Sequence, residues 1–96
     1  MYRVVVHQRA ARYLKRLPQG KKERIKSVLH NLALDPLNHP NVKSMVGEWA
    51  GYRRVRVGNI RIIFWIENAE EIIYVDHIGP RGDVYKWEQG GSGHYR

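Results

Sequence analysis

Residues 51–65 constrain the fold most, because they are typical of two β-strands joined by a tight turn. Val, Ile and aromatic residues fill both halves, and Gly58-Asn59 between them is a strong signal for a two-residue hairpin loop. Such a loop places Arg56 opposite Arg61, and alternation divides the side chains between two faces. One face holds Val55, Val57, Ile60, Ile62 and Phe64, and the other, the arginine face, holds Tyr52, Arg54, Arg56, Arg61, Ile63 and Trp65. Like charges across a ladder destabilise a sheet, so the arginine face predicts an anionic ligand.

The charge of the whole chain is consistent with this hypothesis. Seventeen Lys and Arg against nine Asp and Glu give a formal net charge of +8 in 96 residues. That balance favours nucleic acid, an anionic membrane surface or an acidic protein as partner, with a merely solubilising basic surface as the alternative. Cysteine is absent, which removes disulfides, thiol catalysis and cysteine–zinc sites and fits a reducing cytoplasm. No apolar run approaches the roughly 20 residues that span a bilayer, and the N-terminus has a strand pattern rather than that of a signal peptide.

The length and periodicity predict one α+β domain of order βααβββ. Strand patterns cover residues 2–7 and 72–78 besides the hairpin, and helical spacing covers residues 9–17 and 21–34. Asp35-Pro36 ends the second helix, because proline disfavours helix at the residue before it. We expect an αα-hairpin packed on one face of an antiparallel sheet. The arginine face should stay open, since burying arginines under helices would cost too much.

Two connecting segments carry further predictions. Residues 37–47 are predicted to be a loop with a short strand or turn, held to the core by Met45 and Val46. The single domain is predicted to cover residues 1–88, followed by a flexible Gly-rich tail over residues 89–96.

The turn after the hairpin sets a second register. If it closes symmetrically, Tyr74 pairs with Trp65 and Asp76 pairs with Ile63, which places Asp76 on the arginine face. Trp65 and Tyr74 have two interpretations of equal weight, as structural aromatics or as base-stacking residues.

The βαα opening, Met45-Val46-Gly47, the run over residues 54–64 and the closing run over residues 78–86 together resemble the RelE/ParE superfamily of toxins from toxin–antitoxin pairs. The likeness is closest to the RelE-type mRNA interferases, which cleave mRNA in the ribosomal A site. The resemblance implies a cytoplasmic, metal-independent endoribonuclease without a cofactor. It also implies three partners, namely a cognate antitoxin that blocks the basic face, the ribosome and mRNA, with no membrane involved.

The resemblance also implies site residues. By position, Arg54 and Arg56 match the paired basic residues of the first hairpin strand, and Arg61 matches the arginine of the second. Arg81 and Tyr85 match the closing arginine and tyrosine of the family. The best-studied pattern has lysines where this chain has Arg54 and Arg56.

Further basic residues are candidates for contacts with RNA backbone. Lys22 and Lys26 belong to a basic helix surface, for which plain solvation is the alternative, and Lys86 follows the closing tyrosine.

Many family members carry histidine where Pro80 stands. The five histidines have no metal-ligand spacing, so no metal site is predicted.

RNA cleavage without a metal needs a deprotonated 2′-hydroxyl, charge stabilisation at the phosphate and an acid for the leaving 5′-oxygen. Arginines suit the second task, because their planar forks grip phosphate oxygens. They are poor bases, since their pKa lies above ~12. Proton transfer is left to Tyr85, Asp76, His77 or Glu48, among which the sequence does not choose.

Other functions remain open. One is a ParE-like protein that inhibits DNA gyrase and cleaves nothing, and another is an inactive member that only binds its antitoxin. The full basic set with Tyr85 favours the nuclease, whereas the replacement of lysine by arginine keeps the inactive alternative open. A salt-bridged or solvated strand face is the structural alternative for the three arginines.

Overall fold

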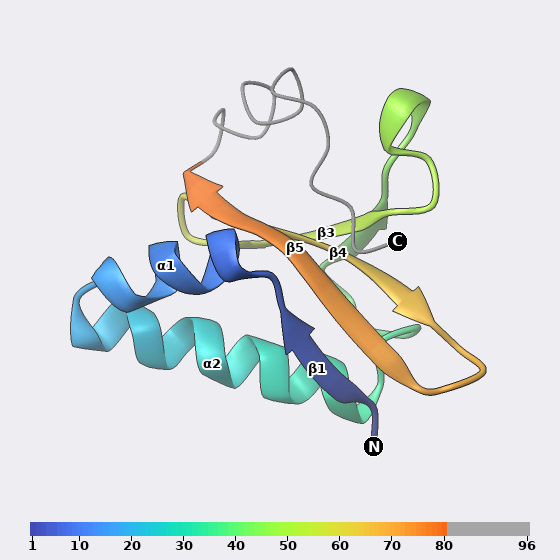
Figure 1. Ribbon diagram of the computed structural model, residues 1–96, viewed down its shortest axis with the longest axis horizontal. Coiled ribbons are helices and arrows are strands. Elements are labelled where there is room, and N and C mark those ends of the chain that lie inside the picture. Colours follow the sequence, from blue (N-terminus) through green and yellow to red (C-terminus); the bar gives the residue numbers. More distant parts are fainter. Residues whose placement is uncertain (81–96) are drawn as a thin grey trace.

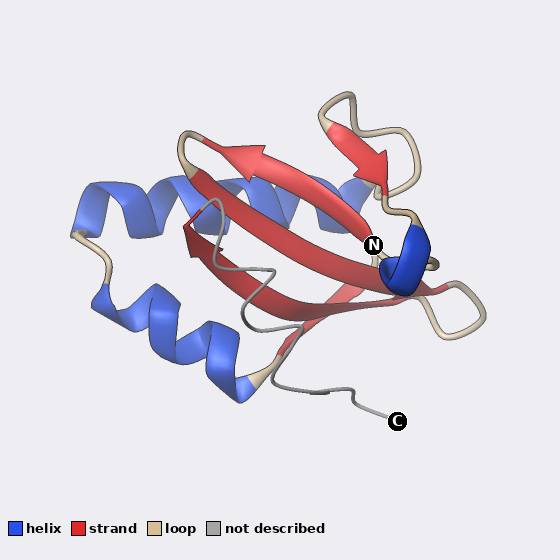
Figure 2. Cartoon of the chain, turned by 90° about the horizontal axis from the view of Figure 1, so that it is seen from above, coloured by secondary structure: helices blue, strands red, loops and turns tan. Residues whose placement is uncertain are grey.

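A five-stranded sheet with two helices on one face forms the part of the chain that the computed structural model describes, residues 1–80 (Figures 1 and 2). The elements are β1 (Arg3–Val6), α1 (Gln8–Arg16), α2 (Gln19–Leu34), β2 (Val42–Ser44), η1 (Gly47–Trp49), β3 (Arg53–Val57), β4 (Ile60–Glu67) and β5 (Ile72–Pro80). The α+β class is confirmed, and β2 is a short edge strand within residues 37–47, where the sequence predicted a loop with a short strand or turn. The predicted end of the domain at residue 88 and the tail over residues 89–96 lie outside the described residues.

The strands run in the order β1-β5-β4-β3-β2 across the sheet. β1 pairs with β5 in parallel, while the β5-β4, β4-β3 and β3-β2 pairs are antiparallel. The sheet is therefore mixed, and the wholly antiparallel sheet expected from the sequence is wrong at the β1-β5 pair. The αα-hairpin connects the first strand to the far edge and covers one face on the way (Figure 1). The hairpin β3-β4 therefore lies within the sheet rather than at its rim.

The β3-β4 turn has the geometry that its two residues predict. Gly58 adopts a φ of +63°, and the register pairs Arg56 with Arg61 and Val57 with Ile60, as expected. Glycine at the first central position of a two-residue loop is the mark of a type II′ turn, because a Cβ is disfavoured at that φ.

The β4-β5 register departs from the prediction at one point. Tyr74 pairs with Trp65 as expected, but Ile63 pairs with His77, and the expected pairing with Asp76 is wrong. The register shifts between Ile63 and the next residue of β4, so that Asp76 becomes the extra residue of a β-bulge. Strict alternation cannot anticipate such an insertion. His77 therefore takes the register position beside the arginines that alternation assigned to Asp76.

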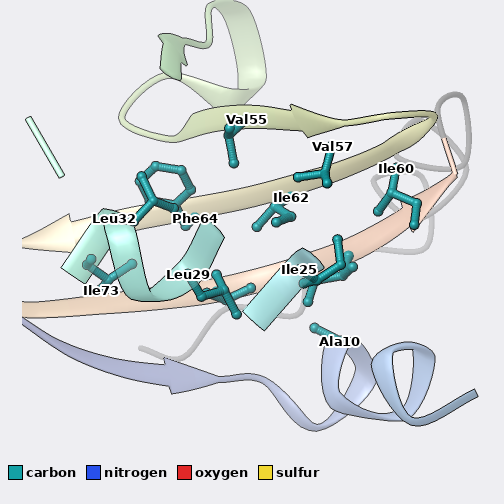
Figure 3. Close-up of a cluster of buried hydrophobic side chains, with 12 residues drawn as sticks. Ala10, Ile25, Leu29, Leu32, Val55, Val57, Ile60, Ile62, Phe64 and Ile73 are labelled. Carbon is teal, nitrogen blue, oxygen red and sulfur yellow. The ribbon is translucent and has the colours of Figure 1, made fainter. Parts of the chain in front are cut away.

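The core lies between the sheet and the helices, and the residues labelled in Figure 3 show both sides of it. Ile25 and Leu32 of α2 are fully buried against the sheet, where Phe64 and Ile62 are also fully buried. The helices predicted over residues 9–17 and 21–34 pack on the sheet as expected, and the apolar face of the hairpin is confirmed. Burial of each large side chain of this kind contributes about 1.5–3 kcal/mol.

A second, smaller apolar cluster lies on the opposite face of the sheet. Trp49, Tyr52 and Ile63 are buried in it, and Met45 and Trp65 pack against it. The 3₁₀ turn η1, which contributes Trp49, lies on the side of the sheet away from α1 and α2 (Figure 1). One end of the arginine face is therefore covered rather than open.

The loop before η1 is held by one of its two predicted anchors. The Met45 N–H donates to the Tyr52 carbonyl oxygen at 2.9 Å, and the Met45 side chain packs against Trp49 and its neighbours. Val46 is 85% exposed, so its predicted role as an anchor is wrong. The backbone is extended at Val46, and successive side chains of an extended chain point to opposite sides.

Candidate nucleic-acid interface

The cross-strand register arranges the arginine face in rows of directly opposite residues. One row consists of Lys43, Arg54, Ile63 and His77, and the next consists of Arg56, Arg61 and Gly79. Directly opposite residues have Cβ atoms about 4.5–5.5 Å apart. Four basic side chains on three neighbouring strands therefore share one surface, and this set is the candidate site.

The three arginines differ in how far they reach into solvent. Arg56 is exposed, Arg54 is half-buried, and Arg61 on the middle strand is only 6% exposed. Within residues 1–80, the buried Nε of Arg61 has no hydrogen-bond partner. A buried polar group without a partner costs free energy, and a phosphate is well suited to accept from a guanidinium fork. An anion that accepts a hydrogen bond from Arg61 would therefore offset this cost.

Lys43 is a site residue that was not predicted from the sequence. It lies on the short edge strand β2, directly opposite Arg54, in a segment that was expected to be mainly loop. Together with Pro40, Asn41, Arg54 and Arg56 it lines a groove of about 370 Å³. The signal that could have found Lys43 is weak, because three residues of β2 are too few to show a period.

The remaining predicted residues fall into two groups. Lys22 and Lys26 lie on α2, which covers the opposite face of the sheet, so they cannot contact the same phosphate as the arginine face (Figure 2). Arg81, Tyr85 and Lys86 lie outside the described residues.

The candidates for proton transfer differ in their position relative to the arginine rows. Glu48 is exposed on η1, and Asp76 is fully buried at the bulge. His77 belongs to the first row and is 8% exposed. Tyr85 lies outside the described residues. Of the candidates that the structure describes, His77 is the one that shares a row with an arginine.

The aromatic residues of the face contact one another. The rings of Trp65 and Tyr74 stack with centroids 4.5 Å apart and planes at 18°, and Trp49 meets Tyr52 edge to face at 5.0 Å. These contacts favour a structural role for Trp65 and Tyr74 over base stacking.

Neither a metal cluster nor a membrane helix is found in the part of the chain that the structure describes. No three His, Asp or Glu side chains of residues 1–80 come together in a group that could hold a metal ion. Neither described helix is long and apolar enough to cross a membrane.

An αα-hairpin on one face of a mixed sheet, with basic residues on the other, defines a RelE-like toxin fold. The chain belongs to the RelE/ParE superfamily, since the family model described as "ParE toxin of type II toxin-antitoxin system, parDE" matches residues 4–85. No curated protein matches the chain significantly in sequence.

Solved structures of toxins share this fold. The toxin–antitoxin complex RelBE2 from Mycobacterium tuberculosis contains a chain with 23% identity and a TM-score of 0.74, over 83% of this chain and 98% of that one. The archaeal RelE-RelB complex from Pyrococcus horikoshii OT3 gives 26% identity and a TM-score of 0.73, over 84% and 96%. The isolated RelE toxin of E. coli is 17% identical with a TM-score of 0.71, and the match covers 94% of this chain and 97% of that one.

Proposed function

We propose that this protein is a ribosome-dependent mRNA endonuclease that inhibits translation in the cytoplasm and is neutralised by a cognate antitoxin. The observation that carries the proposal is the pair of arginines directly opposite each other, Arg56 exposed and Arg61 buried with a polar atom in need of an acceptor. A pair of like charges is unfavourable in the free protein, so a polyanionic ligand offsets a cost that the fold itself carries.

The chemistry follows from what guanidinium groups do well. Arg54, Arg56 and Arg61 would hold the scissile phosphate and stabilise the extra negative charge of the pentacoordinate state, a contribution that is usually the largest single one. Arg81 and Tyr85 complete the proposed catalytic set by their resemblance to the closing residues of the family. Lys22, Lys26 and Lys86 are proposed to contact RNA backbone away from the reacting phosphate.

The proposed partners follow from the family and from charge. A cognate antitoxin is supported by the fold's occurrence in the RelBE2 and RelE-RelB complexes. A segment that covers the arginine face would prevent RNA binding, and acidic residues in it would complement Lys43, Arg54 and Arg56. The ribosome and mRNA are proposed because several cations lie close together on neighbouring strands. Such a set of cations suits the repeated negative charges of a phosphate backbone.

The second candidate is inhibition of DNA gyrase without any cleavage. It is favoured by the family model, whose description is of a ParE toxin. The basic rows across β2, β3 and β4 favour the nuclease instead, since binding a protein target does not require a buried arginine whose Nε lacks a hydrogen-bond partner within residues 1–80.

Primer extension on programmed ribosomes tests the proposal. Purified toxin is expected to produce mRNA ends at fixed positions within codons, and no cleavage of the same RNA without ribosomes. Arg61→Ala and Arg81→Ala are expected to relieve growth inhibition while the antitoxin still co-purifies with each variant, because single truncations leave most of the covered surface intact. Arg12→Ala, at an exposed position of α1, is the matched control and should remain toxic.

The same preparation separates the two candidates. Codon-positioned cleavage with unchanged gyrase supercoiling supports the nuclease. Intact mRNA together with inhibited supercoiling would instead support inhibition of DNA gyrase as the function. Full toxicity of both Arg61→Ala and Arg81→Ala would contradict the proposed catalytic set.

A further inference from the structure

The ring of His77 occupies the space where residue 79 would carry a side chain. A Cβ added to Gly79 would lie 2.8 Å from His77 Nε2 and 3.2 Å from Cε1, which is closer than real Cβ atoms approach. Gly79 is not among the glycines with positive φ, so its backbone conformation does not require glycine. The space beside Gly79 is filled by the imidazole of His77, which would have to shift to admit a Cβ there.

That space lies directly across the ladder from Arg61. The β4-β5 register pairs Arg61 with Gly79 and Ile63 with His77. A Cβ at position 79 would be about 4.5–5.5 Å from the Cβ of Arg61, and Nε2 of His77 lies against that point. The imidazole therefore lies close to the start of the Arg61 side chain, and the two residues are 8% and 6% exposed.

We propose that His77 is the general base of the RNA cleavage reaction, an inference that rests on the proposed nuclease function. Nε2 takes the proton of the 2′-hydroxyl, and the 2′-oxygen forms a bond to phosphorus as the bond from phosphorus to the 5′-oxygen breaks. The leaving 5′-oxygen takes a proton from water, and His77 then returns its proton to solvent. The products are a 2′,3′-cyclic phosphate and a 5′-hydroxyl.

The division of tasks between the two neighbours follows from their chemistry. An imidazole exchanges a proton near neutral pH, whereas a guanidinium keeps its proton and stabilises charge. A phosphate held by Arg61 brings the adjoining ribose close to the imidazole beside it. Asp76 is fully buried at the bulge and Glu48 lies on η1 outside the rows. Nε2 of His77 is buried as well, but of the three residues His77 is the one that shares a row with an arginine.

The first test compares His77→Gln with wild type in single-turnover cleavage on programmed ribosomes. Loss of a general base typically lowers the rate by about 10²–10⁴-fold. His30→Gln, an exposed histidine on α2, is the matched control and should cleave at the wild-type rate. Co-purification with the antitoxin and an unchanged thermal melt establish that each variant is folded.

A modified mRNA distinguishes a base from an acid. When sulfur replaces the bridging 5′-oxygen, the thiolate leaves without being protonated, so the defect of a variant lacking the acid disappears. We expect the His77→Gln defect to persist with the sulfur substrate at about the same size as with the oxygen substrate. Rescue by sulfur would overturn the assignment as base.

A double-mutant cycle tests the geometry by a second route. Gly79→Ala should displace the imidazole and slow cleavage, and the double variant should be no slower than His77→Gln alone. Additive effects of the two substitutions would overturn the proposed coupling, and wild-type rates for His77→Gln would overturn the role altogether. If wild-type toxin cleaves nothing on ribosomes, the nuclease function and this inference fall together, whereas cleavage that is insensitive to His77 refutes only the inference.

Discussion

Arg61 is buried on a central strand in surroundings that are unfavourable for a guanidinium in the free protein. It is 6% exposed on a central strand, faces another arginine across the ladder and has a buried Nε without a hydrogen-bond partner within residues 1–80. Each of these features is unfavourable in the free protein. The aliphatic part of the side chain is the only portion that burial favours.

Replacing Arg61 with methionine separates these contributions. Methionine keeps a long apolar stem and removes the charge, so Arg61→Met is expected to leave the free energy of unfolding unchanged or to raise it by about 1 kcal/mol while toxicity is lost. Urea unfolding followed by circular dichroism measures the first quantity, and growth on induction measures the second. A decrease of several kcal/mol in the free energy of unfolding would mean that the guanidinium stabilises the sheet, which would contradict this prediction.

At the scale of elements, the β3-β4 hairpin fixes the site, since its turn determines which residues are opposite each other. A one-residue slip would move every arginine to the helix-covered face and every core residue into solvent. The type II′ turn at Gly58 therefore positions the proposed site as well as stabilising the fold.

Two glycine-to-alanine substitutions with opposite expected signs test this role. Gly58→Ala is expected to lower the free energy of unfolding by about 1–2 kcal/mol, because a Cβ at a φ of +63° is strained. Gly20→Ala, within α2 and with nothing near its added Cβ, is expected to raise it by about 0.5–1 kcal/mol. Urea unfolding of both variants is the measurement. Equal effects of the same sign would contradict the turn geometry.

The elements also show what could be predicted from the sequence and what could not. The register of Arg56 with Arg61 was predictable because a two-residue loop leaves no choice of pairing. That His77 rather than Asp76 pairs with Ile63 was not predictable, because a bulge depends on packing on both sides of the sheet and cannot be recognised from alternation in the sequence. Lys43 was missed for a related reason. A strand of three residues is too short to show an alternating pattern, and its position depends on pairing with β3.

At the scale of the molecule, the sheet separates two surfaces with different tasks. The helices cover the apolar face, and Lys22 and Lys26 belong to α2, while the arginine face is on the other side of the sheet (Figure 2). A net charge of +8 is therefore divided between two sides of a small domain. The two sides are expected to respond differently to RNA.

The salt dependence of binding tests the division. Each phosphate neutralised on a single strand contributes about −0.7 to the slope of log affinity against log salt, so Lys43, Arg54, Arg56 and Arg61 together give a slope of about −3. With a short 2′-O-methyl RNA, Lys43→Gln should reduce the magnitude of the slope by about 0.7, while Lys26→Gln leaves it unchanged and weakens only binding to whole ribosomes. Equal effects of both variants on the short RNA would contradict the separation.

The parallel pairing of β1 with β5 has a consequence for how the protein is made. Arg3 pairs with Ile72, and the Tyr2 and His7 N–H groups donate to Ala33 and Val75 carbonyl oxygens, both at 2.8 Å. The first strand to be synthesised must wait for the last one before its edge is paired, and contacts so distant in sequence form late in folding. We expect a nascent chain to stay incompletely folded until synthesis has passed β5.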